Sequence, residues 1–257
     1  MMVWILILSL ITLLSLFIYM YREAFGNRVV YHTLEFSAFP ESFRTVKLFF
    51  ISDIHRRTVS DSIIDEVKGN VDVVIVGGDL LEKGVPLERV KNNIMKLKTL
   101  GPVLFVWGNN DYEGDVPVLD AMLLSLDVKV LVNDSILFQS EEGERLYFIG
   151  LDEVSKDRHN LELAMEEVEL DSFKILVCHN PEIRREIEPK YGINLLLSGH
   201  THGGQIRLFG YGPYEKGSLK KIDELTVLIS NGYGTTGIPF RLGAKAETHL
   251  ITIKHET

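Results

Sequence analysis

Five short polar segments hold the residues best suited to chemistry, and each one directly follows an apolar, β-branched run. They supply carboxylate, amide and imidazole groups without a thiolate, a donor set that suits divalent ions such as Mn, Fe or Zn. One metal needs fewer donors, so the pattern predicts two metals that share a carboxylate. The segments are Ser52-Asp53-Ile54-His55, Gly77-Gly78-Asp79, Gly108-Asn109-Asn110-Asp111, Cys178-His179-Asn180-Pro181 and Gly199-His200-Thr201-His202-Gly203-Gly204-Gln205.

The apolar runs before these segments predict buried strands, because near-continuous apolar character is typical of strands covered on both faces. Amphipathic segments between them predict helices on the outside. The pattern therefore indicates an α/β domain of two packed sheets flanked by helices. We expect strands at 46–51, 71–76, 103–107, 146–149, 175–177 and 193–197, a second group at 147–152, 227–230 and 248–253, and helices at 62–67, 86–100, 118–126 and 161–168.

The positions of the polar side chains relative to these strands predict a single site. In open α/β sheets, ligands bind outside the carboxyl ends of the strands. Asp53, Asp79, Asn109, His179 and His200 each come just after such an end. Taken singly, each has a simpler explanation, such as a helix cap, a turn or a buried histidine. Their common placement favours metal binding.

The composition limits the classes of function. The chain has 257 residues, of which 46% are hydrophobic and 25% charged, enough for one substantial core in a single domain. A net charge of −9 argues against a broad nucleic-acid-binding face, so we expect no nucleic-acid partner. An anionic substrate remains compatible, because bound metals would supply local positive charge. Cys178 is the only cysteine, which excludes an intrachain disulfide.

The first 21 residues predict a transmembrane anchor. Residues 1–21 have no charged side chain, and at 1.5 Å per residue they would span roughly 30 Å, the thickness of a bilayer core. Trp4 lies near one end and Tyr19 and Tyr21 lie at the other, where aromatic rings favour the membrane interface. The alternative is a cleaved signal peptide. That class typically has a basic leading region and a small-residue cleavage site, which this sequence lacks.

The residues after the apolar stretch predict the orientation. Arg22 and Arg28 follow it and nothing basic precedes it, which favours a cytoplasmic domain. We therefore expect a single-pass protein of the cell membrane. Its parts would be the anchor, a juxtamembrane segment at 22–44 and a catalytic domain at 45–257.

The order Asp-x-His, Gly-Asp, Gly-Asn-x-Asp, His and Gly-His-x-His resembles the calcineurin-like metallophosphoesterase family. The Gly-His-Thr-His-Gly-Gly-Gln segment is similar to that of a membrane-associated bacterial branch, and the likeness runs from about residue 46 to 253. The resemblance implies the calcineurin-like α/β sandwich and a metal-dependent phosphoric ester hydrolase. It also implies two sets of ligands that share Asp79 as a bridge. One set is Asp53, His55, Asp79 and His202, and the other is Asp79, Asn109, His179 and His200.

A pair of metals would clamp phosphoryl oxygens and lower the pKa of a shared water, which supplies hydroxide for in-line attack. The family usually has His after the Gly-Asn pair, and the resemblance gives that residue a part in protonating the leaving group. Asn110 stands there in this chain, and it donates hydrogen bonds but not a proton at neutral pH. Asp111 follows it. Arg56 and, in a Gly-rich loop, Arg241 are candidate phosphate contacts, and each has a purely structural alternative.

Two hypotheses on function remain. The first is a phosphoesterase that acts on a phosphomonoester, phosphodiester or pyrophosphate, with a lipid-linked substrate as one option, because a membrane tether raises the effective concentration of such substrates. The second is a metal-stabilised interaction module that lost turnover together with the general-acid histidine. A nuclease is disfavoured by the acidic charge balance. The sequence leaves the substrate, the identity of the metals and the oligomeric state open.

Overall fold

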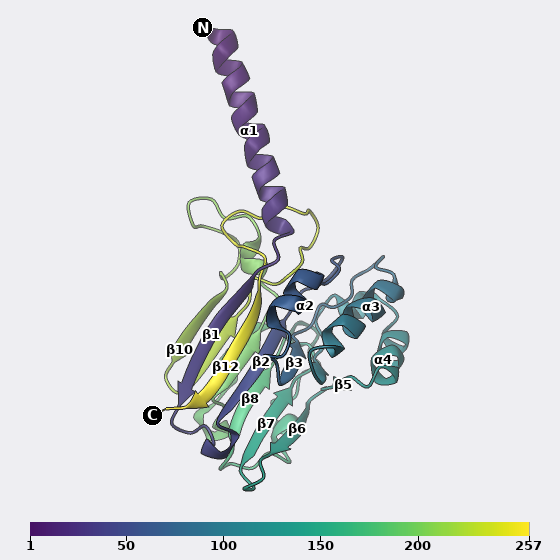
Figure 1. Ribbon diagram of the computed structural model, residues 1–257, viewed down its shortest axis with the longest axis vertical. Coiled ribbons are helices and arrows are strands. Elements are labelled where there is room, and N and C mark those ends of the chain that lie inside the picture. The colour runs from purple at the N-terminus through teal and green to yellow at the C-terminus, as the bar shows by residue number, and fades with distance from the viewer. Residues whose placement is uncertain (257) are drawn as a thin grey trace.

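The structure, a computed structural model, describes residues 1–256. It consists of two six-stranded sheets packed face to face, with helices on the outside and one long helix projecting from one end (Figure 1). Side chains from both sheets form the central core, which includes Leu48, Ile75, Phe148 and Leu197. The predicted α/β sandwich of two mixed sheets flanked by helices is confirmed.

The first sheet has the strand order β1-β12-β2-β3-β4-β5. Its strands pair in parallel except for β12 and β2, which are antiparallel. The second sheet has the order β10-β11-β9-β8-β7-β6, and its two outer pairs are antiparallel. The strands are β1 Val29–Phe36, β2 Thr45–Ile51, β3 Val73–Val76, β4 Val103–Phe105, β5 Lys129–Val130, β6 Asp134–Gln139, β7 Arg145–Gly150, β8 Phe173–Val177, β9 Leu195–Ser198, β10 Ser218–Ile222, β11 Leu225–Ile229 and β12 Thr248–His255.

Helices α2, α3 and α4 cover the first sheet, and α5 covers the second. Side-chain caps begin three of them: Ser60 at α2, Asp115 at α4 and Asn160 at α5 each accept a hydrogen bond from a backbone N–H in the first turn. The α-helices are α1 Met2–Ala24, α2 Asp61–Val67, α3 Leu87–Lys98, α4 Val116–Ser125 and α5 Leu161–Met165, and the 3₁₀ helices are η1 Glu41–Phe43, η2 Asp111–Glu113, η3 Val154–Lys156, η4 Pro181–Arg185, η5 Pro189–Tyr191 and η6 His202–Gly204.

Some elements differ from the sequence prediction. The segment 22–44, predicted as a juxtamembrane connection, contains β1, which pairs with β12 at the edge of the first sheet. The helix predicted at 161–168 ends at Met165. Strands β6 and β10 were not predicted, because their residues are mostly exposed or half-buried and form no continuous apolar run.

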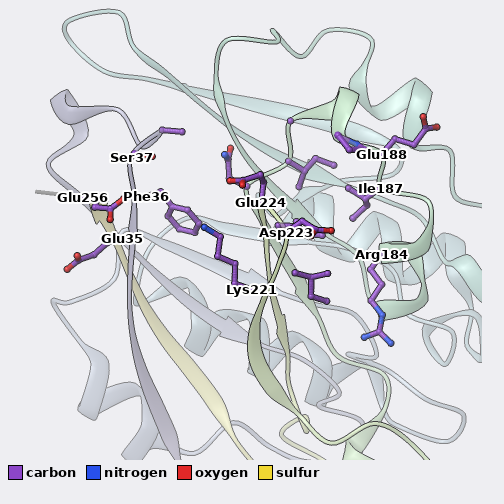
Figure 2. A pocket seen from close by; sticks show the side chains of 17 residues that line it. Glu35, Phe36, Ser37, Arg184, Ile187, Glu188, Lys221, Asp223, Glu224 and Glu256 are labelled. Atoms are coloured by element: carbon purple, nitrogen blue, oxygen red, sulfur yellow. The ribbon is translucent and has the colours of Figure 1, made fainter.

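The strand register places the carboxyl end of β2 beside the helix α1. Val29 at the start of β1 pairs with Thr248, and the next residue of β12, His249, pairs with Phe50 near the end of β2. The carboxyl ends of β2 and its parallel neighbours therefore lie at the end of the domain from which α1 projects (Figure 1). A separate cavity of about 480 Å³ lies at the other end, where Phe36, Arg184, Lys221 and Asp223 are among its lining residues (Figure 2). It contains none of the predicted metal ligands.

Candidate metal centre

The loops that follow the strands hold the predicted ligands in unusual backbone conformations. Asp53, His55, Asp79, His200 and His202 have φ angles of 54°, 50°, 52°, 70° and 48°. Positive φ is uncommon for residues other than glycine and persists only where the surrounding structure imposes it. Such strained residues cluster at functional sites. The fold therefore fixes these five side chains in place by their backbone.

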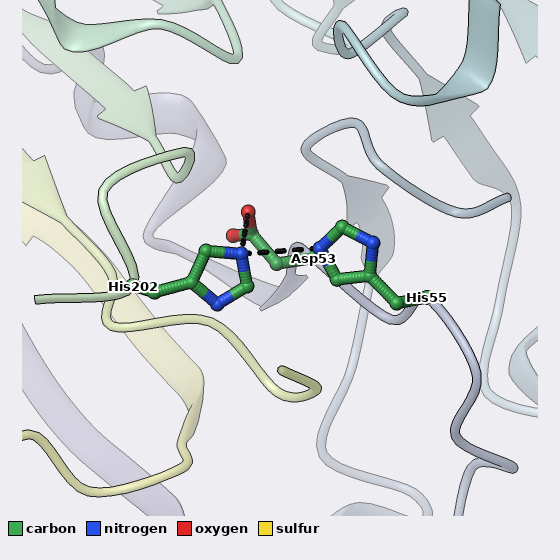
Figure 3. Close-up of side chains that lie close together, drawn as sticks. All are labelled: Asp53, His55 and His202. Atoms are coloured by element: carbon green, nitrogen blue, oxygen red, sulfur yellow. Dashed lines mark hydrogen bonds and ion pairs between the residues drawn. The ribbon is translucent and has the colours of Figure 1, made fainter. Parts of the chain in front are cut away.

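One group of buried side chains consists of Asp53, His55 and His202 (Figure 3). The Nε2 atoms of the two imidazoles are 3.1 Å apart, and Nε2 of His202 lies 3.3 Å from Oδ1 of Asp53. His55 comes from the loop after β2 and His202 from the loop after β9, so the two sheets contribute to the same cluster. These atoms lie close enough together to bind one ion.

A second group consists of Asp53, Asp79 and His179. Nε2 of His179 lies 3.3 Å from Oδ2 of Asp79 and 4.0 Å from Oδ1 of Asp53. The same Oδ2 atom of Asp79 is 3.7 Å from Nε2 of His55, so one oxygen faces an imidazole of each group. That position suits a carboxylate shared by two metals. Asp53 also belongs to both groups, and the bridging role of Asp79 stays a prediction.

Asn109 and His200 lie beside these groups and are half-buried. Nδ1 of His200 and Oδ1 of Asn109 are 2.8 Å apart. Both residues line a cavity of about 490 Å³ together with Asp79, Asn110 and His202. Their part in metal binding stays a prediction, but their side chains face the cavity through which a substrate would reach the two buried groups.

The imidazole of His179 fits the role of a metal ligand. Its Nδ1 lies 2.8 Å from the carbonyl oxygen of Gly77, which accepts a hydrogen bond from the ring when Nδ1 carries the proton. Nε2 is buried and has no hydrogen-bond partner among the described residues. A ring held by Nδ1–H to a backbone carbonyl, with Nε2 left free, is the usual arrangement of a metal-bound histidine. Nitrogen and oxygen donors of this kind suit divalent ions.

The charges of the cluster favour ionised carboxylates. Burial alone would raise the pKa of Asp79, but the facing imidazoles of His179 and His55 and the N–H of Asn110 outweigh burial and lower that pKa. Burial lowers the pKa of His202 to about 3, so its ring is neutral at pH 7. Burial alone would lower the pKa of His179 and of His55, but the carboxylate of Asp79, together with that of Glu82 beside His55, raises both, so metal binding to these two rings would release protons.

Glu82 is a functional residue that sequence reasoning missed. Its side chain is buried, and its Oε2 lies 3.0 Å from Nδ1 of His55, on the ring side away from the metal groups. Its other oxygen forms an ion pair with Nε of Arg56. A carboxylate at the distal nitrogen of a ligand histidine fixes the tautomer and the orientation of the ring. The only signal in the sequence is its position three residues after Asp79, which alone indicates nothing.

Asp111, predicted as a catalytic residue, is fully buried behind the loops. Its carboxylate accepts hydrogen bonds of 2.7–2.8 Å from the backbone N–H groups of Asp79, Leu81 and Gly108. These contacts connect the loops after β3 and β4. Burial and the nearby charge of Asp79 raise the pKa of Asp111 to about 7. A direct catalytic contact of Asp111 stays a prediction, whereas its role in holding Asp79 is evident.

The two candidate phosphate contacts lie away from the cavity. The guanidinium of Arg241 is fully buried, where it donates to the carbonyl oxygen of Asn231 at 2.6 Å and lies 3.3 Å from Nδ1 of His202. Arg56 is mostly exposed, pairs with Glu82 and does not line the cavity that Asn110 lines. Contact of either arginine with a substrate stays a prediction that would require its side chain to move.

The two packed sheets and the buried groups of carboxylates and imidazoles define an α/β protein with candidate metal sites, and comparison with known proteins identifies the family. The chain belongs to the calcineurin-like phosphoesterase family, whose model matches residues 46–204. The family resemblance seen in the sequence is thus confirmed, while the assignment to one bacterial branch stays a prediction.

The chain is similar to several curated proteins and shares its fold with solved structures. The chain is 42% identical to the uncharacterized protein YpbG of Bacillus subtilis (strain 168), over 91% of this chain and 90% of that protein. It is 30% identical to a transmembrane protein with metallophosphoesterase domain from Bos taurus, over 82% of this chain but only 54% of that protein. A provisionally assigned 5′-nucleotidase from Staphylococcus aureus has the same fold, with a TM-score of 0.53 and 12% identity over 83% of this chain and 55% of that one.

Proposed function

We propose that this protein hydrolyses a phosphomonoester, phosphodiester or pyrophosphate with two divalent metal ions. The observation that supports this most directly is the convergence of two buried ligand groups, which share Asp53, beside a cavity of about 490 Å³ that one member of each group, His202 and Asp79, lines. When bound, two such ions would clamp phosphoryl oxygens and lower the pKa of a water molecule. Mn, Fe and Zn all suit the nitrogen and oxygen donors.

The chain's own residues would hold and orient the reacting groups. Asp53, His55, Asp79, His179 and His202 supply the donors. All five follow strand ends, and all except His179 have positive φ angles that the surrounding structure imposes. Such rigid placement reduces the reorganisation needed when charge develops on the phosphoryl group.

Asn110 lies on the wall of the same cavity, and its backbone N–H donates to Oδ1 of Asp79 at 2.8 Å. Its amide can donate a hydrogen bond to a leaving-group oxygen but cannot protonate it at neutral pH. We therefore expect ester groups with a leaving group of low pKa to be hydrolysed most readily, because loss of a general acid costs about 10²–10⁴ in rate for poor leaving groups.

Asn110 also favours the alternative function, a metal-stabilised interaction module with weak or no turnover. No histidine stands at that position. The histidines that line the cavity are His200 and His202, and both are predicted metal ligands. An interaction module and an enzyme would bind the same metals. They differ in turnover.

We also propose that α1 anchors the protein in the cell membrane with the catalytic domain in the cytoplasm. Met2–Ala24 is long and apolar enough to cross a bilayer. Its most apolar 18-residue stretch has a mean hydropathy of 2.5, and none of that stretch is buried against the domain. Arg22 and Arg28 after the span support this orientation. A tethered domain would meet lipid-linked phosphate esters at high effective concentration.

The test is metal-dependent turnover by the full-length protein in nanodiscs. After chelation, Mn²⁺, Fe²⁺ and Zn²⁺ are added separately, and hydrolysis of p-nitrophenyl phosphate and bis(p-nitrophenyl) phosphate is measured together with bound metal. We expect two ions per chain and a rise of at least about 10-fold over the metal-free protein. Asp53→Asn should abolish metal binding and turnover. Glu113→Gln, which changes an exposed glutamate at the edge of the cavity, should alter neither metal binding nor turnover. Two bound ions without turnover of either ester would favour the interaction module, and failure to bind metal would refute both functions.

A further inference from the structure

We infer that the face around the base of α1 binds the lipid surface through an exposed apolar rim that no part of the domain covers. This inference rests on the proposed membrane anchor and adds a second contact with the same bilayer. The rim comes from two loops, one between η6 and β10 and the other between β11 and β12. Its exposed side chains are Leu208, Phe209, Tyr211 and Ile238, and the half-buried Phe240 joins them to α1.

The loop between β11 and β12 packs directly on α1. The ring of Phe240 lies 5.7 Å from that of Phe17 and 6.4 Å from that of Tyr21, measured between centroids. The backbone N–H of Arg241 donates to the carbonyl oxygen of Met20 at 3.0 Å. Phe17 lies inside the predicted span and Tyr21 at its end, so Phe240 lies at the depth where the span meets the interface. The helix is thus fixed to the domain and does not leave it through a flexible linker.

The loop between η6 and β10 is hydrogen-bonded to the loop between β11 and β12. The N–H of Arg207 donates to the carbonyl oxygen of Leu242 at 2.7 Å, and the N–H of Leu242 donates to Gln205 at 2.8 Å. The guanidinium of Arg207 donates to the carbonyl oxygens of Gly210 and Tyr214 at 2.7 Å each, which closes the loop from within. In Figure 1 the green and the yellow loops reach past the strand ends on either side of the base of α1.

The side chains at the tip of the loop between η6 and β10 contact almost nothing in the domain. Phe209 is completely exposed and Tyr211 is 83% exposed, although the loop that carries them is held by its own hydrogen bonds. Exposed apolar patches of this kind mark interaction sites. Aromatic side chains are enriched at the membrane–water interface. Because the rim surrounds the end of a membrane-spanning helix, the partner that lies against it is the bilayer itself.

The rim lies next to the mouth of the candidate active site. Pro213 and Tyr214, in the loop between η6 and β10, line the same cavity as Asn110, His200 and His202. A rim embedded in the interface would hold this mouth at the level of the lipid headgroups. A phosphate ester that is attached to an amphiphile would then reach the cavity without leaving the membrane surface.

The test measures the depth of single residues in full-length protein in nanodiscs of phosphatidylcholine and phosphatidylglycerol. Nitroxide labels are attached to Phe209→Cys, to Leu10→Cys within the span and to Leu170→Cys as a matched control. Leu170 is 77% exposed and precedes β8, at the end of the domain opposite α1. The native Cys178 is fully buried, and the unsubstituted chain serves as the labelling blank. Collision rates with oxygen and with a water-soluble nickel chelate are compared, because oxygen concentrates in the hydrocarbon and the chelate stays in water.

We expect the labels at Leu10 and Phe209 to collide mainly with oxygen and the label at Leu170 mainly with nickel. A span label in lipid with an aqueous label at Phe209 would overturn the rim and leave the anchor intact. Aqueous labels at both would overturn the anchor as well. A label at Phe209 shielded from both reagents would mean that a second copy of the chain covers the rim, which also overturns the inference. None of these readouts depends on turnover, so failure of the proposed hydrolase function is distinguished from failure of the rim.

Discussion

Glu82 offers the sharpest test of how the metal centre is held together. Its carboxylate lies 3.0 Å from Nδ1 of His55 and is also paired with Arg56. Glu82→Gln keeps the size of the side chain and an oxygen that can accept the Nδ1–H, but it removes the charge. Glu82→Ala removes both. The pair of variants therefore separates the orientation of the ring from the electrostatic support of the ligand.

The expected magnitude follows from the geometry. Loss of a partner behind a metal ligand costs about 10–100-fold in metal affinity, or about 1.4–2.8 kcal/mol. Because a glutamine oxygen can still hold the ring, Glu82→Gln should lie near the lower limit and Glu82→Ala near the upper one. Glu82 is 5% exposed, so solvent screens its interaction with His55 only weakly.

The assay is titration of the metal-free variants with Mn²⁺, with thermal unfolding measured in parallel. Arg56→Ala is the matched control, since it breaks the ion pair with Glu82 and leaves the contact with His55 in place. We expect this control to bind metal within about 3-fold of the parent, because exposed ion pairs contribute little. Unchanged Mn²⁺ affinity in Glu82→Ala, with the fold intact, would refute the assignment of Glu82 as the residue that orients His55.

Three further predictions test the site and the fold. Asp79→Asn should lower the metal content more than His55→Ala, because Asp79 faces imidazoles of both ligand groups; two ions retained would contradict the bridge. Asn110→His should raise the rate on an alkyl phosphodiester about 10-fold and that on an aryl ester less, and equal or lower rates on all esters would show that no general acid belongs there. Burial lowers the pKa of His249 to about 3, so the folded protein keeps this ring neutral while the unfolded chain protonates it near pH 6.5. Its contribution to stability is therefore present above pH 6.5 and is lost as the pH falls toward 3. We expect this one ring to account for about 2 kcal/mol of the decrease in the free energy of unfolding between pH 7 and 5, and His249→Gln to remove that part of the decrease in chemical denaturation.

The metal groups could be predicted from the sequence because their signals are local. Each ligand follows a buried strand whose near-continuous apolar run identifies it, and parallel strands end at the same edge of a sheet. The structure brings together Asp53, His55, Asp79, His179 and His202, as the pattern indicated. It also shows that Asp53 belongs to both buried groups, a detail that depends on the rotation of side chains and not on their order in the chain.

The residues that support the ligands could not be predicted, because their roles depend on contacts between distant loops. Glu82 has meaning only once the loop after β3 is folded against His55. Arg241 had been a candidate for a substrate contact because of the composition of its loop. In the structure its guanidinium is enclosed by backbone carbonyl oxygens, which neither composition nor spacing reveals. Strand β1 was missed for a similar reason: it is an edge strand with alternating exposure and lacks a continuous apolar run.

Arg57 connects these unpredicted contacts with α1, the proposed membrane anchor. Its guanidinium donates to the carbonyl oxygens of Gly26 at 3.1 Å and of Tyr233 at 2.6 Å, and it stacks 3.6 Å above the ring of Tyr233. Arg57 lies two residues after His55, so the chain just beyond α1 and a loop of the metal centre share one buried cation. Burial lowers the pKa of Arg57, yet the group keeps its charge at neutral pH, and the carbonyl oxygens around it offset the cost of its burial. The end of α1 and the residues just after it are therefore part of the framework that positions the predicted ligands.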